Sequence, residues 1–310
     1  MSSGGRSHTA PTSDRKPVSL PRLAEMQVNG EPIVMVTAYD YPSATVAEAA
    51  GVDVVLVGDS AANVVLGYPD TKLVSMDEMV VLGKAVRRGL KTPLMVGDMP
   101  MGSYEASNEE AIRSAQRLVK ETGCQAVKLE AGGVVVERAR AIVNSGIPVM
   151  GHIGLTPQTA TALGGYKAQG KTAKDAIQLL EDALALQAVG CFAIVFEAVP
   201  AEVTEAIVAK LDIPSIGIGA GPATSGQVLV FHDLLGITTG HMAKFVKRYA
   251  EVHDSMVTAV GSYGEEVRTG KFPGPEHSYA IDETELARFR DYIDQESLTS
   301  AKAWEWEPLS

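Results

Sequence analysis

The feature that most constrains the fold is an alternation of two patterns along most of the chain. From Pro32 onward, short runs rich in valine and isoleucine alternate with stretches whose apolar residues recur at helical spacing. The clear strand candidates are residues 33–39, 54–57, 94–97, 126–129, 149–152, 193–196 and 215–219, with a weak eighth near 243–245. Helices are predicted over residues 76–89, 108–121, 134–144 and 172–189. Repeated units of this kind build parallel strands joined by right-handed crossovers.

The predicted strands are apolar on both faces, so both faces must be covered by other elements. This leaves an open doubly wound sheet or a closed barrel, and eight units over about 250 residues favour a (β/α)₈ TIM barrel. We expect the barrel to occupy residues 21–277. We expect residues 1–20 to form a disordered N-terminal extension and residues 278–310 to form an acidic, partly helical C-terminal extension.

The chain is acidic, because 27 lysine and arginine residues against 38 aspartate and glutamate residues give a net charge of −11. This charge repels nucleic-acid phosphates and anionic membrane surfaces, so neither is an expected partner. No apolar run approaches the ~18 residues of a membrane span, and the start of the chain lacks an apolar signal segment. Two cysteines, Cys124 and Cys191, provide no disulfide framework. We therefore expect a cytoplasmic protein.

Polar side chains end most of the predicted strands, where a barrel of this kind has its active site. They are Asp40, Asp59, Asp98, Glu130, His152 and Glu197. Five carboxylates at one mouth repel each other unless they share a proton or a cation, which favours a bound Mg²⁺ ion. Asp59 and Asp98 are the best ligand candidates, because each follows a near-identical strand ending in Val-Gly-Asp. Asp40 is equally well explained as a helix cap.

Lys128 and Glu130 lie two residues apart on one predicted strand, so their side chains point the same way. They form either a structural ion pair or a functional pair, with Lys128 on an anionic substrate and Glu130 near the metal. A Schiff-base lysine is disfavoured, because nearby carboxylates raise the pKa of Lys128. Glu197 ends an apolar run that favours a raised pKa and an acid–base role, although simple solvation at a packing edge explains it too. His152 is equally a candidate for a buried core imidazole.

One motif points to a different protein class. Residues 165–172 satisfy the P-loop pattern of nucleotide hydrolases, and residues 192–197 resemble the acidic strand that accompanies it. A P-loop is entered directly from a strand, whereas residues 156–163 predict a turn and an irregular loop. The glycines at 217, 219 and 221 are a weak phosphate-binding signal that also fits a crowded barrel strand. A nucleotide-binding function is therefore a remote alternative.

Nine motifs together resemble the ketopantoate hydroxymethyltransferase family over roughly residues 20–277. They are TAYD (37–40), VGDS (57–60), GDMP (97–100), VKLE (127–130), GHIGLTPQ (151–158), GGYKAQGK (164–171), EAVP (197–200), IGIGAG (216–221) and HDLLGI (232–237). The resemblance implies a barrel of the phosphoenolpyruvate/pyruvate-binding type. It implies hydroxymethyl transfer from 5,10-methylenetetrahydrofolate to 3-methyl-2-oxobutanoate through a Mg²⁺-stabilised enolate, giving 2-dehydropantoate in the first step of pantothenate and coenzyme A synthesis. It also implies a homo-oligomer, expected to be a decamer.

The same resemblance implies roles for individual residues. Asp59, Asp98 and Glu130 surround the metal, and Asp59, Ser60, Asp98 and Lys128 contact the oxo acid. Glu197 matches the proton acceptor. Tyr39 and His152 are candidates to contact and position these side chains without contacting the substrate. Residues 71–76 depart from the family, which usually has a Leu-Pro-Val-Thr-like stretch there.

Two alternatives stay open at this point. A metal-dependent carbon–carbon lyase or phosphonomutase from the same barrel superfamily acts on related 2-oxo acids but needs no folate. A non-catalytic module that binds a 2-oxo acid or a nucleotide would not need the strand-end carboxylates.

The C-terminal extension is unusually acidic and contains one predicted helix, residues 283–295. We expect this helix to pack across a subunit boundary. A chain truncated after Tyr279 should then lose assembly in analytical ultracentrifugation. An unchanged sedimentation profile would contradict this role.

Overall fold

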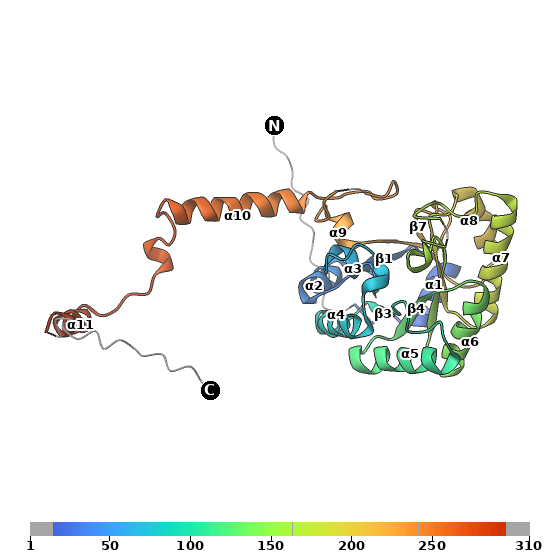
Figure 1. The fold of residues 1–310 in the computed structure, drawn as a ribbon, viewed down its shortest axis with the longest axis horizontal. Coiled ribbons are helices and arrows are strands. Elements are labelled where there is room, and N and C mark those ends of the chain that lie inside the picture. Colours follow the sequence, from blue (N-terminus) through green and yellow to red (C-terminus); the bar gives the residue numbers. More distant parts are fainter. Residues whose placement is uncertain (1–14, 163, 241, 296–310) are drawn as a thin grey trace. The chain divides into compact units, whose positions relative to one another are not determined.

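The computed structural model describes residues 15–162, 164–240 and 242–295. Eight parallel strands close into a barrel in the order β1 to β8, which confirms the predicted fold class (Figure 1). The strands are β1 (Ile33–Thr37), β2 (Val54–Val57), β3 (Leu94–Asp98), β4 (Ala126–Glu130), β5 (Val149–Gly154), β6 (Ala193–Glu197), β7 (Ser215–Ile218) and β8 (Gly226–Leu229). Strand β8 pairs with both β1 and β7, so the sheet has no free edge.

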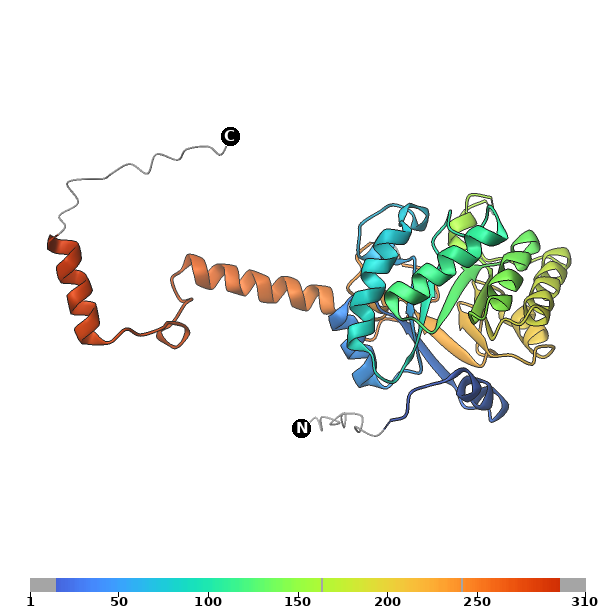
Figure 2. The same cartoon turned by 90° about the horizontal axis from the view of Figure 1, so that it is seen from below.

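Helices surround the strands on the outside of the barrel (Figure 2). They are α2 (Tyr41–Ala50), α4 (Met76–Gly89), α5 (Asn108–Thr122), α6 (Val136–Asn144), α7 (Ala173–Ala188) and α8 (Ala201–Val208), with the short α3 (Ala61–Val64), α9 (Phe231–Leu234), η1 (Thr71–Leu73), η2 (Gly133–Val135) and η3 (Pro157–Thr159) between elements. Ser75 caps α4 with a reciprocal bond to Glu78, and Gly123 ends α5 in the left-handed conformation. The predicted helices are confirmed to within a few residues.

The strand alternation separates two apolar cores. Ala126 points into the barrel, whereas Val127 and Leu129 point outward against the helices. Lys128 and Glu130 therefore both point inward, which decides the direction that the sequence left open. Cys124 and Cys191 are both buried and free.

Helix α1 (Leu20–Val28) packs against the interior core of the barrel. Leu23 is 2% exposed and Met26 is 5% exposed, and both belong to the same cluster as the inward residues of β1. The expectation of disorder up to residue 20 is wrong for residues 15–20. The Arg15 guanidinium lies 2.6 Å from the Asp53 carboxylate, and Val18 is buried. A charged partner and an apolar contact thus hold a segment whose composition alone indicated disorder.

The weak eighth strand was placed wrongly. Residues 243–245 form no strand, and β8 lies earlier, at Gly226–Leu229. Its pattern is weak because a side chain at Gly226 would collide with the Ile33 carbonyl oxygen, so glycine is required where an apolar residue would have marked a strand. Phe245 instead packs on the interior core against Gly219, where a Cβ atom would lie 2.5 Å from the Phe245 ring.

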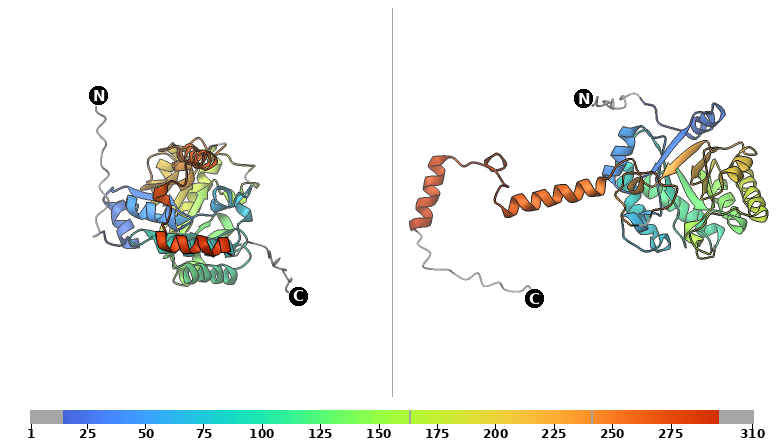
Figure 3. Two further views of the ribbon diagram at one scale, coloured as in Figure 1. Left: turned by 90° about the vertical axis from the view of Figure 1, so that its left-hand side faces the viewer. Right: turned by 90° about the horizontal axis from the view of Figure 1, so that it is seen from above.

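Internal contacts divide the chain into two units, residues 1–253 and residues 254–310, so the structural division comes before the expected boundary at 277. The described part of the second unit contains most of α10 (Val252–Arg268), η4 (Pro275–His277) and α11 (Glu283–Gln295) (Figure 3). Helix α11 has the predicted bounds, and Phe289 and Tyr292 on it are exposed. In the described ranges no helix is both long enough and apolar enough to cross a membrane.

The contact of α1 with the barrel interior predicts a large contribution to stability. Leu23→Ala should lower the free energy of unfolding by about 2–5 kcal/mol, because it leaves a cavity in the interior core. Val28→Ala is the matched control, since Val28 lies on the same helix and is 85% exposed. Urea denaturation followed by circular dichroism measures both variants, and equal losses of stability would contradict the packing role of α1.

Candidate active site

A buried ion pair lies at the mouth of the barrel, where β3 and β4 end side by side. Lys128 Nζ lies 2.8 and 2.9 Å from the two carboxylate oxygens of Asp98, and both side chains are almost fully buried. Burial acts to lower the pKa of Lys128, but the carboxylates of Asp98, Asp59 and Glu130 outweigh it and raise that pKa. Burial raises the pKa of Asp98 while Lys128 opposes this, and the two-pronged contact favours the ionised pair. Lys128 is therefore a fixed cation, which argues against a Schiff-base role.

Gln158 connects the carboxylates that flank this pair, and no role was predicted for it from the sequence. Its Nε2 donates to Asp59 Oδ2 at 3.0 Å and to the Met99 carbonyl at 3.1 Å, and its backbone N–H donates to Glu130 Oε2 at 3.0 Å. The Tyr104 hydroxyl donates to Gln158 Oε1 at 2.6 Å. The only available signal was the motif at 151–158, of which Gln158 is the last residue. An amide on a short 3₁₀ turn has no spacing that predicts such a contact.

His152 stands between two carboxylates, Glu130 and Glu197. Its Nδ1 lies 3.8 Å from Glu130 Oε1, and its Nε2 lies 3.3 Å from Glu197 Oε2. Neither ring nitrogen makes a hydrogen bond within the described residues, and burial together with Lys128 lowers the pKa of His152 well below its usual value. Burial raises the pKa of Glu197 to about 7, although Lys128 opposes the shift. A neutral imidazole thus adjoins a carboxyl group that titrates near neutrality.

Ser60 and Tyr39 form a second polar contact at the mouth, on the side of β1 and β2. The Tyr39 hydroxyl and Ser60 Oγ are 2.8 Å apart, and burial raises the pKa of Tyr39, which keeps it protonated. Asp40 does not join them. It is exposed and caps α2, accepting from the Ser43 backbone N–H at 2.8 Å, so the cap interpretation is confirmed.

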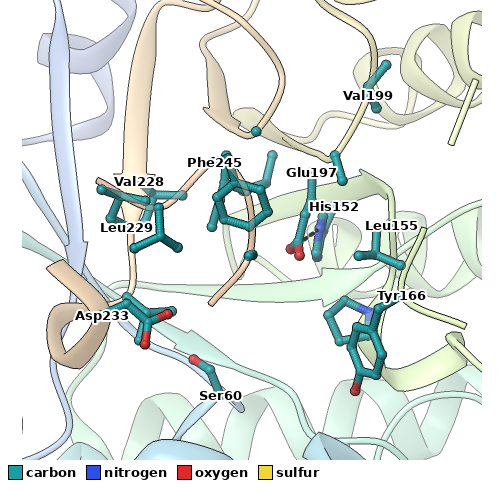
Figure 4. A pocket seen from close by; sticks show the side chains of 18 of the residues that line it. Ser60, His152, Leu155, Tyr166, Glu197, Val199, Val228, Leu229, Asp233 and Phe245 are labelled. Atoms are coloured by element: carbon teal, nitrogen blue, oxygen red, sulfur yellow. Dashed lines mark ion pairs between the residues drawn. The ribbon is translucent and has the colours of Figure 1, made fainter. Parts of the chain in front are cut away.

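A cavity of about 1000 Å³ opens above these residues. Lys128, Glu130, His152 and Glu197 line it, as do Asp59, Ser60 and Asp98. Figure 4 shows Glu197 and His152 beside each other, with Tyr166 from the loop after β5 on the same side. That loop contains the P-loop pattern, but η3 and irregular chain separate it from β5, so its context is not that of a P-loop.

The arrangement fits Mg²⁺ in an open site. Across the described ranges, no group of three or more histidine, cysteine, aspartate or glutamate side chains is close enough to enclose a metal. Asp59 and Asp98 are neighbours, since the Asp59 backbone N–H donates to Asp98 Oδ2 at 3.2 Å. Mg²⁺ is usually held by one or two carboxylates, with water and substrate oxygens as its other ligands. Asp59 and Asp98 can provide the two carboxylates. The buried Glu130 Oε1 makes no hydrogen bond within the described chain, so it is available to accept one from a metal-bound water.

Solved structures with the same architecture define the class of fold. Phosphonopyruvate hydrolase in complex with oxalate and Mg²⁺ is similar with a TM-score of 0.56 at 12% identity, covering 90% of this chain and 99% of that one. 2,3-Dimethylmalate lyase, a member of the PEP mutase/isocitrate lyase superfamily, is similar with a TM-score of 0.53 at 15% identity, covering 91% and 98%. The chain therefore has the TIM-barrel fold that these structures share. Likeness at this level of identity concerns the fold alone.

Sequence comparison identifies the family within that class. The model of the ketopantoate hydroxymethyltransferase family matches residues 17–275. A 3-methyl-2-oxobutanoate hydroxymethyltransferase from Heliobacterium modesticaldum is 53% identical over 268 residues, covering 86% of this chain and 97% of the relative. A relative from Arabidopsis thaliana with the same activity in its name, and described there as mitochondrial, is 49% identical over 286 residues, covering 90% and 82%. The chain belongs to the ketopantoate hydroxymethyltransferase family and is an enzyme of that class.

Proposed function

We propose that the enzyme transfers a hydroxymethyl group from 5,10-methylenetetrahydrofolate to 3-methyl-2-oxobutanoate and so forms 2-dehydropantoate. The observation that carries the proposal is the pairing of a titratable base with an anion site on one cavity floor. Glu197 has a pKa of about 7, and Lys128 supplies a buried positive charge nearby. The proposal takes from the family resemblance the pathway to pantothenate and coenzyme A and a homo-oligomer, expected to be a decamer. It takes a cytoplasmic location from the two cysteines, which form no disulfide.

The residues of the floor divide into those that bind and those that move a proton. Lys128 and Ser60 bind the carboxylate and oxo groups of the substrate. Asp59 and Asp98 would hold Mg²⁺ and so would also face the substrate, and Glu130 would accept a hydrogen bond from metal-bound water. When bound, Mg²⁺ supplies positive charge that stabilises the developing enolate.

Glu197 takes the proton from C3 of the oxo acid. Its carboxylate stands at the end of an apolar strand, and burial raises its pKa to about 7, which suits a general base. His152 is neutral, so it does not compensate the negative charge of the adjacent Glu197 carboxylate. Its ring lies between Glu197 and Glu130. The enolate carbon then bonds to the methylene carbon of the folate while one C–N bond of that carbon breaks, and the freed nitrogen takes the proton held by Glu197. Water displaces the second nitrogen, giving its hydroxyl group to the product and its remaining proton to tetrahydrofolate.

The lyase and phosphonomutase alternatives are not favoured. The structures with those activities in their names are about 12–15% identical to this chain, whereas a hydroxymethyltransferase is 53% identical. Product formation that did not depend on methylenetetrahydrofolate would reopen the alternatives.

The proton-transfer role predicts the behaviour of Glu197→Gln. NMR of 3-methyl-2-oxobutanoate in D₂O should show deuterium entering C3 with the wild-type enzyme and Mg²⁺. The variant should exchange about 10²–10⁴ times more slowly, because the amide cannot accept the proton. The wild-type rate should fall about tenfold per pH unit below 7 and level off above it, since only the ionised carboxylate is a base.

The matched control for this prediction is Glu202→Gln, which alters an exposed glutamate in the first turn of α8. It should exchange deuterium as the wild type does. Unchanged exchange in Glu197→Gln would remove Glu197 from the proton-transfer role.

The metal role predicts that Asp59→Asn and Asp98→Asn each weaken Mg²⁺ affinity and activity together, by about tenfold or more. Isothermal titration calorimetry with Mg²⁺ and the oxo acid measures the affinity. Asp40→Asn is the control, because Asp40 also follows a strand but caps α2, and asparagine is an equally good cap. Undiminished affinity in both Asp59→Asn and Asp98→Asn would exclude them as ligands.

A further inference from the structure

The cavity extends well beyond the groups that the oxo acid needs. Its volume of about 1000 Å³ lies at the upper end of the roughly 300–1,000 Å³ typical of small-molecule sites. On the side away from Glu197 and Tyr166, the cavity is lined by Val228, Leu229 and Asp233 (Figure 4). A five-carbon oxo acid held at Lys128 would leave this side unfilled. We call this part, lined by Ile218, Val228, Leu229, Asp233 and Phe245, the side chamber.

The side chamber has one acidic group, and it is held in place. Asp233 Oδ1 accepts a hydrogen bond from Thr238 Oγ1 at 2.6 Å. Helix α9, which carries Asp233, is tied to β1, because the Phe231 backbone N–H donates to the buried Thr37 Oγ1 at 2.8 Å. No donor in the described chain reaches Asp233 Oδ2, and the residue lines the cavity half-buried. Asp233 thus presents a fixed acceptor that the proton-transfer chemistry does not use.

Apart from Asp233, the residues that define the side chamber are apolar, while Thr37, Thr238 and Lys244 also line the cavity. Ile218 and Val228 come from β7 and β8, and Phe245 packs against their cluster and against Gly219. An aromatic ring beside aliphatic side chains suits a flat ligand whose edge carries polar groups. Ser60 and Asp233 line the same cavity, so such a ligand would share that cavity with the oxo acid (Figure 4).

We propose that the side chamber binds the pterin ring of the folate co-substrate, with Asp233 accepting hydrogen bonds from its 2-amino and N3–H groups. The carboxylate has lone pairs for both donors in addition to the bond from Thr238. The apolar walls contact the ring faces, and the reactive methylene group on N5 faces the oxo acid. This inference rests on the proposed function, because it assigns the second substrate of the same reaction.

The test is Asp233→Asn, which keeps the shape of the side chain but replaces an acceptor with an amide. Calorimetry with tetrahydrofolate, in the presence of Mg²⁺ and the oxo acid, should show a Kd raised tenfold or more. The KM for methylenetetrahydrofolate should rise to a similar extent. The KM for the oxo acid in the folate-free deuterium exchange should change less than threefold. Asp77→Asn, on the outer helix α4, is the control and should match the wild type in all three.

The results that would contradict the Asp233 assignment differ from those that would contradict the proposed function. An Asp233→Asn variant that binds tetrahydrofolate with wild-type affinity would overturn the assignment. An equal loss of C3 deuterium exchange and of hydroxymethyl transfer would also overturn it, because it would indicate that Asp233 only holds Thr238 in place. Wild-type enzyme without C3 exchange would instead refute the proposed function.

A ligand-side measurement covers a variant that folds poorly. Tetrahydrofolate lacking the 2-amino group should bind the wild type at least tenfold more weakly than tetrahydrofolate does. Equal binding of the two compounds would overturn the role of Asp233 as an acceptor for that group.

Discussion

The buried contact between Lys128 and Asp98 is the interaction on which the rest of the site depends. Three further carboxylates, those of Asp59, Glu130 and Glu197, lie at the same barrel mouth, and burying so many negative charges costs free energy unless a cation compensates. Lys128 provides that charge from within the fold, and its own ionisation is maintained by the acids around it. The strand alternation makes this arrangement obligatory, because Lys128 and Glu130 must share one face of β4.

The Lys128–Asp98 pair also affects the pKa values of neighbouring groups. The charge of Lys128 lowers the pKa of His152 in addition to the effect of burial, which leaves the imidazole neutral between two acids. The same charge opposes the rise in the pKa of Glu197 but does not prevent it. The charge of Lys128 therefore affects its two neighbours differently: His152 stays neutral, whereas Glu197 titrates.

Much of the fold could be predicted from the sequence, because seven strands have continuous apolar runs and most helices carry capping residues. The eighth strand could not be found this way, since close contact with β1 requires Gly226 where an apolar side chain would have marked it. The inward direction of Lys128 and Glu130 also required the structure. Gln158 was missed because its contacts with Asp59, Met99 and Glu130 join segments far apart in the chain. Residues 15–20 were misjudged because Arg15 is held by a partner that composition does not reveal.

The packing of α1 against the interior core determines from which side ligands reach the floor of the cavity. Side chains and this helix fill the barrel beneath the carboxylates, so ligands reach the floor from the opposite, open mouth. Under the proposed function, the oxo acid and the folate ring would share this route. A folate bound first would then restrict access to the floor, and steady-state kinetics would distinguish ordered from random binding.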